Sequence, residues 1–194
     1  MVAERERLEQ RAAFEERISK SQKLSATAYH EAGHAVIAYV LGREIKEVSI
    51  VPKGRKAGRV RYKKITAIKE PELLDLAVMS LAGFVAQDRH CRTDDGLSTF
   101  LGGQSDMKQI MMAVDHQYLQ KRKARHLPTY GTRHYWAMRH QTYFRMKRLE
   151  DETRKLVDKY WPAIERVAAV LMSVQVIKGH DKLVAIIKEA MSRP

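Results

Sequence analysis

The five residues from His30 to His34 read His-Glu-Ala-Gly-His, and their types and spacing could carry out chemistry together. On an α-helix, four residues advance about 6 Å and slightly more than one turn, so both imidazoles would leave the same face and could bind one metal ion. Glu31 would project about 100° away from His30, where its carboxylate could take a proton from a water molecule. This pattern is typical of zinc hydrolases, and the alternative is a hydrogen-bonded histidine pair.

The segment around these residues is typical of a helix inside a core. It is rich in alanine and aliphatic side chains up to Leu41, Gly42 would end it, and Ser25 or Thr27 could cap its start. Histidines and a glutamate buried on such a helix need water, a polar network or a metal as partners.

A catalytic zinc ion usually has three protein ligands and one open position, so a further ligand must come from elsewhere in the chain. The metzincin extension is excluded, because Ile37 and Val40 stand where that class needs glycine and histidine. Spacing alone leaves the third ligand open among Glu72, His90, Asp94, Asp95 and Asp106.

The elements expected around the motif are mainly helical. Strands are predicted at 45–52 and 59–62, a core helix at 71–90, a loop at 93–103, and further helices at 106–125, 133–160, 162–177 and 181–192, with Ser105 as a cap. The predicted fold is therefore mainly α (α+β), with a small β-sheet after the histidine helix and a C-terminal helical bundle. Residues 1–22 are predicted to be a charged helical extension, and 23–194 a single domain.

The composition fits a soluble, cytoplasmic protein. The chain has 194 residues, no secretory signal pattern and no apolar run long enough to span a bilayer. Its single cysteine, Cys91, excludes an internal disulfide and is compatible with a reducing compartment.

The net charge of +13 is concentrated in the segment 116–149, which contains no Asp or Glu. Its nine cations are Lys121, Arg122, Lys123, Arg125, Arg133, Arg139, Arg145, Lys147 and Arg148. Aromatic residues interleave with them: Tyr118, Tyr130, Tyr135, Trp136, Tyr143 and Phe144. Such a composition suits attraction to phosphates and stacking on bases, although a solvated helix face or a site for an acidic partner has the same pattern.

Several segments in the same order resemble the peptidase domain of the FtsH-type (M41) zinc metallopeptidases. They are Ala28–Val36, Val48–Gly54, Leu81-Ala82-Gly83, Gly102–Met107 and Trp161–Ile187. The resemblance implies a Zn²⁺ cofactor, His30 and His34 as two ligands, Asp106 as the third, and Glu31 as the catalytic residue.

The chain also departs from the pattern of that family. Phe84 and Gln87 stand where the family usually has arginine and glutamate, and the basic segment 116–149 has no counterpart that aligns. The family normally joins this domain to an ATPase and a membrane anchor, whereas this sequence has no G-x-x-x-x-G-K-[ST] motif and no spanning segment.

The sequence thus predicts a zinc metalloendopeptidase without a built-in ATPase, which hydrolyses unfolded or flexible polypeptides. A separate ATPase or adaptor and a homo-oligomer are left open as partners. The alternative function is a catalytically weak or inactive metal-containing binding module, whose basic aromatic stretch binds nucleic acid or an acidic partner.

Overall fold

The structure, a computed structural model, describes residues 20–54, 56–63, 70–91, 104–123 and 126–192. These residues form six helices and a small three-stranded antiparallel sheet, so the mainly α prediction is confirmed. Most of the extension predicted at 1–22 and the loop predicted at 93–103 lie outside the described residues. The predicted boundary between the N-terminal extension (1–22) and the domain (23–194) stays a prediction.

Helix α2, Lys20–Val40, is the central helix of the fold. Its buried face is made of small and aliphatic side chains with no exposed surface, namely Ala28, Ala32, Ala35, Val36, Ile37 and Ala38. After the helix, Gly42 has a φ of +74°, a left-handed conformation that glycine adopts without strain. The helix begins before Ser25 and Thr27, so the prediction that one of them caps it is wrong: Thr27 instead bonds the carbonyl oxygen of Lys23.

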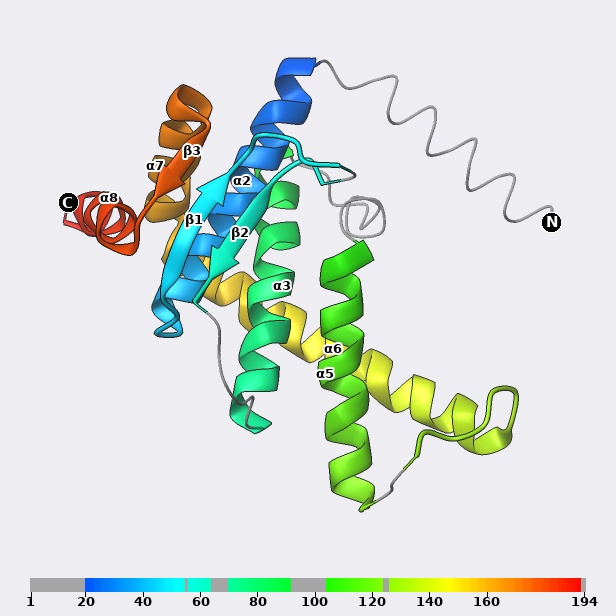
Figure 1. The fold of residues 1–194 in the computed structure, drawn as a ribbon. Coiled ribbons are helices and arrows are strands. Elements are labelled where there is room, and N and C mark those ends of the chain that lie inside the picture. The colour runs from blue at the N-terminus through cyan, green and yellow to red at the C-terminus, as the bar shows by residue number, and fades with distance from the viewer. Residues whose placement is uncertain (1–19, 55, 64–69, 92–103, 124–125, 193–194) are drawn as a thin grey trace.

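The sheet has the strand order β2-β1-β3, and it lies along α2 (Figure 1). Strands β1, Ile45–Ser49, and β2, Arg59–Tyr62, pair in antiparallel fashion. Strand β2 has its predicted range, whereas β1 ends at Ser49, before the predicted 52. Strand β3, Val176–Lys178, pairs with the other edge of β1. The predicted helix 162–177 therefore extends too far. Its apolar pattern also suits a strand, and pairing with β1 decides the outcome.

Helix α3, Glu70–Cys91, lies between α2 and helix α5, Gln104–Arg122 (Figure 1). The contact between α2 and α3 is close, because a Cβ atom added to Gly33 would collide with the backbone carbonyl of Ala82 and lie 2.7 Å from the Cβ of Ala86. On its other side α3 shares a second apolar cluster with α5 and α6, which includes Leu81, Phe84 and Ile110.

The C-terminal part consists of helices α6, Arg133–Lys159, α7, Trp161–Val174, and α8, His180–Met191. Helix α7 packs directly on α2, and buried residues such as Ile164 and Leu171 join the main core beneath it. Helix α6 crosses behind α3 and α5, and its N-terminal half extends away from the sheet (Figure 1). Among the described helices, none has the length and apolar character needed to span a bilayer.

Candidate metal centre

His30 and His34 lie one turn apart on α2 and direct their rings to the same point. Their Nε2 atoms are 2.9 Å apart, and the ring planes are perpendicular. Both residues are buried, with 7% and 6% of their surface exposed. Two unprotonated nitrogens at this distance would repel each other, so the pair needs a proton or a cation between them.

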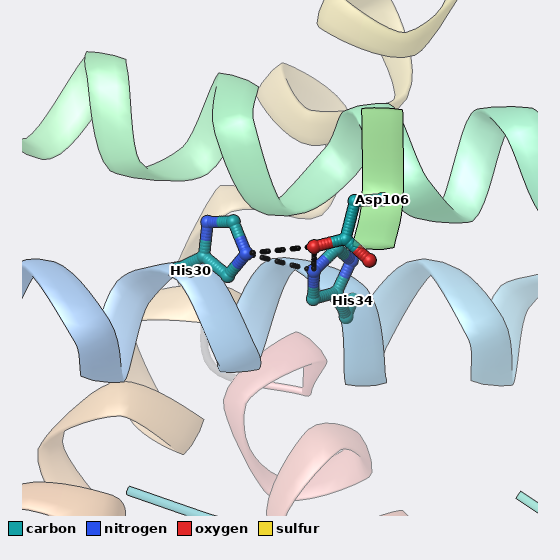
Figure 2. Close-up of side chains that lie close together, drawn as sticks. All are labelled: His30, His34 and Asp106. Carbon is teal, nitrogen blue, oxygen red and sulfur yellow. Dashed lines mark hydrogen bonds and ion pairs between the residues drawn. The ribbon is translucent and has the colours of Figure 1, made fainter. Parts of the chain in front are cut away.

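Asp106 reaches the same point from the first turn of α5 (Figure 2). Its Oδ2 atom lies 3.6 Å from Nε2 of His30 and 3.7 Å from Nε2 of His34. Burial opposes the ionisation of this carboxyl, but its polar contacts with the two histidines hold its pKa well below the ordinary value. The three side chains thus present two imidazole nitrogens and one carboxylate oxygen to a shared position.

The backbone of α3 fixes the orientation of His34. Its Nδ1 atom lies 2.6 Å from the carbonyl oxygen of Met79, and this bond is buried. A carbonyl oxygen can only accept, so Nδ1 carries the proton and Nε2 keeps its lone pair for the shared position. A partner of this kind is the usual means by which a protein sets the tautomer of a metal-binding histidine.

His30 is held mainly by packing. The ring of Phe84 meets it edge to face, with centroids 5.3 Å apart. Nδ1 of His30 is buried without a hydrogen bond among the described residues, although the Gln87 side chain is near enough to raise the pKa of the ring. Burial is the stronger influence, and it lowers that pKa. Phe84 and Gln87, which stand where the family usually has arginine and glutamate, thus lie beside His30.

Gly83 makes room for the two imidazoles where α3 passes over them. A Cβ atom added there would lie 2.5 Å from Cε1 and Nε2 of His34 and 3.0 Å from Cε1 of His30. Real Cβ atoms do not come this close to ring atoms, so any other residue would displace the histidines. A glycine inside a helical pattern costs about 1 kcal/mol relative to alanine, and its presence therefore indicates a packing requirement.

The donor set fits zinc in type and in spacing. Zinc binds imidazole nitrogen and carboxylate oxygen at about 2.0–2.2 Å, which places the ligand atoms of a tetrahedral site about 3.3 Å from one another. The observed separations of 2.9, 3.6 and 3.7 Å lie around that value. Among the described residues, these three form the group of His, Cys, Asp or Glu side chains that could hold a metal ion.

The other candidates for the third ligand do not join this group. His90 lies elsewhere, because its ring stacks on Tyr29 at 3.7 Å between centroids and its Nε2 bonds the hydroxyl of Ser25 at 2.7 Å. Asp94 and Asp95, together with the side chain of Glu72, lie outside the described part of the chain.

Glu31 lies next to the cluster with 6% of its surface exposed. Burial raises its pKa to about 7, and the charge of His34 acts in the opposite direction. A carboxyl with such a pKa can accept a proton near neutral pH and pass it on. The turn before β2 closes over this side chain, since a Cβ atom added to Gly58 would lie 2.5 Å from Oε1 of Glu31.

The sequence analysis did not identify the residues that orient or make room for the side chains of the site. Met79 contributes a carbonyl oxygen that any residue type could supply, so its sequence gives no signal. Gly58 lies between the two predicted strands, where a glycine is common, so its residue type gives no signal either. Gly83 belonged to a segment that resembled the FtsH-type family, and its place inside a helical pattern was the available signal.

Comparisons with known proteins place the chain in a family. The family model described as Peptidase family M41 matches residues 16–159. The ATP-dependent zinc metalloprotease FtsH of Thermus thermophilus is 29% identical over 161 residues, which are 75% of this chain and 24% of that protein. The ATP-dependent zinc metalloprotease FtsH of Malacoplasma penetrans is 25% identical over 186 residues, which are 90% of this chain and 21% of the relative.

A third relative, the ATP-dependent zinc metalloprotease FtsH 3 of Symbiobacterium thermophilum, is 32% identical over 77 residues, which are 37% of this chain and 12% of that protein. The chain thus spans less than a quarter of the length of each of these three relatives. The family model nevertheless covers well over half of the chain, and the protein belongs to peptidase family M41.

Proposed function

We propose that this protein is a zinc-dependent endopeptidase that hydrolyses peptide bonds of unfolded or flexible polypeptides. His30, His34 and Asp106 are the proposed zinc ligands, and Glu31 is the proposed general base. The observation that carries the proposal is the convergence of two Nε2 atoms and one carboxylate oxygen beside a buried glutamate.

When bound, zinc would polarise the scissile carbonyl and make a water molecule more acidic. Glu31 takes the proton of the attacking water and donates it to the leaving amine, a role that suits its buried position beside the two histidines. The carbonyl oxygen of Met79 accepts a hydrogen bond from Nδ1 of His34, which leaves Nε2 with the lone pair that would hold the ion. Phe84 excludes water from one side of His30.

The polypeptide substrate would dock beside the sheet. Strand β2 lies at the edge of the strand order β2-β1-β3, so its outer side can pair with an extended chain. Most backbone hydrogen-bonding groups of a folded domain are already paired, which is why unfolded or flexible segments are the proposed substrates. Folded proteins would need a separate ATPase or adaptor to unfold them. The cytoplasm is the proposed compartment.

Replacement of Glu31 by Gln tests the catalytic role. We expect turnover of an unfolded, casein-like protein to fall by about 10² to 10⁴-fold, because proton transfer by a positioned side chain contributes about that factor. Zinc content, measured by metal analysis of the purified protein, should stay unchanged.

The matched control is Glu44→Gln, which removes an exposed carboxyl that pairs with Lys63 outside the site. Its turnover should equal that of the unaltered protein. Full activity of the Glu31→Gln variant would contradict the proposal.

A further inference from the structure

A groove separate from the metal centre opens between α5 and α6. Its volume is about 590 Å³, and Leu74 of α3 closes one side. Tyr118, Lys121 and Arg122 of α5 line it on one wall, and Phe144, Arg145 and Arg148 of α6 line it on the other. Since α5 rises about 1.5 Å per residue, these α5 residues lie about 18–24 Å along the helix from Asp106.

The basic groove carries four cations, and none of them pairs with a carboxylate of the described residues. Among the residues that the structure describes, no Asp or Glu oxygen lies within 4.0 Å of the charged groups of Lys121, Arg122, Arg145 or Arg148. Glu152 is the acidic residue in the lining. Elsewhere on α6, Arg139 lies 3.5 Å from Asp115 and Lys147 lies 3.1 Å from Glu150, so the helix does pair other cations. Repulsion among the four is relieved when an anion binds between them.

Aromatic rings lie among these cations. The guanidinium of Arg122 is 5.7 Å from the ring centroid of Tyr118. Phe144 has 58% of its surface exposed and contacts His140 at 4.8 Å between centroids. A large apolar ring exposed inside a charged groove is costly in water, so its position indicates a ligand with flat apolar faces.

We propose that this basic groove binds single-stranded nucleic acid. The planar guanidinium groups match phosphate oxygens in pairs, and the rings of Tyr118 and Phe144 offer surfaces on which bases stack. Each nucleotide supplies both a phosphate and a flat base, whereas an acidic peptide supplies carboxylates without regular stacking faces. A second copy of this chain is disfavoured, because it would bring a basic surface against a basic surface.

The test is fluorescence anisotropy of a labelled oligothymidylate of about 15 nucleotides, titrated with the chain of 194 residues. A single strand loses about 0.7 units of log affinity per phosphate contact for each unit of log salt. With four contacts, affinity should fall about fiftyfold between about 50 and about 200 mM salt. The readout is binding, so the result does not depend on the proposed peptidase activity.

Two variants separate the contribution of the charged groups to binding affinity from the contribution of base stacking. In Arg145→Ala/Arg148→Ala two contacts are lost, so the same change in salt should weaken binding only about sevenfold. In Phe144→Ala affinity should fall about fivefold or more while the salt dependence stays unchanged, because stacking is insensitive to salt. Phe144 is exposed, and this variant should fold normally.

The matched control is Lys155→Ala/Lys182→Ala, which removes two exposed charges outside the groove. It should keep the fiftyfold salt dependence. The proposal is overturned if the oligonucleotide does not bind at the lower salt concentration, or if this control and the arginine pair behave alike. It is also overturned if a polyglutamate of equal charge binds as tightly as the oligonucleotide, which would assign the groove to acidic polypeptides.

Discussion

Helix α5 contributes residues to both the metal centre and the basic groove, and the charged side chains at its two ends lie in opposite environments. At its start, Asp106 lies in a buried cluster where the carboxylate faces two imidazoles. Near its end, Lys121 and Arg122 face an open groove, and among the described residues no carboxylate pairs with them. A buried charge must be paired, and the pairing fixes the positions of the side chains involved. Exposed like charges repel each other only weakly in water, so they can remain without a partner until a ligand binds.

The largest expected difference between the two regions concerns their phenylalanines. Phe84 has 2% of its surface exposed, belongs to the second apolar cluster and contacts His30, whereas Phe144 has 58% of its surface exposed. We expect Phe84→Ala to lower the free energy of unfolding by about 3–5 kcal/mol, since it leaves a cavity. Phe144→Ala should change it by less than about 0.5 kcal/mol. Urea unfolding followed by circular dichroism measures both, and equal losses would mean that the groove is part of the core.

Two aspartates on α5 provide the next comparison. Asp106→Ala should weaken zinc binding more than about a hundredfold, because loss of a ligand costs more than loss of a supporting group. Asp115 lies on the same helix as Asp106 but pairs with Arg139 of α6 at 3.5 Å, so Asp115→Ala should leave zinc affinity unchanged. A competition titration against a chelating dye gives both values. Equal affinities of the two variants would exclude Asp106 as a ligand.

The smallest expected effects come from two glycines. Gly83→Ala should weaken zinc binding about tenfold, because the added Cβ displaces both imidazoles. Gly58→Ala should leave zinc affinity unchanged but lower peptidase turnover about tenfold, since its Cβ meets the carboxyl of Glu31. The same dye titration and a casein assay separate the two effects. If both variants changed zinc affinity and turnover in the same way, the separate roles of the histidines as zinc ligands and of Glu31 as general base would be contradicted.

Most helices and strands were predicted correctly from local sequence patterns. The helical period placed α6 at Arg133–Lys159, close to the predicted 133–160, and the β-branched pattern placed β2 at 59–62 as predicted. Failures arose where distant partners decided the outcome. Ser25 bonds His90 of α3 instead of capping its own helix, and Val176–Lys178 becomes a strand because β1 offers a free edge.

The sequence by itself determined the relative positions of side chains that lie on the same helix. The spacing of His30 and His34 places both rings on one face, because every α-helix has 3.6 residues per turn. The spacing left the partner carboxylate open, and Asp106 was named only by the resemblance to the FtsH-type family. The contact itself is decided by the tertiary structure, since it depends on how α3 packs between α2 and α5. The close approach at Gly33 and the missing side chain at Gly83 let α3 pass over the rings, so that Asp106 reaches them from a distant part of the chain. Such contacts depend on shape complementarity between helices, which no local period encodes.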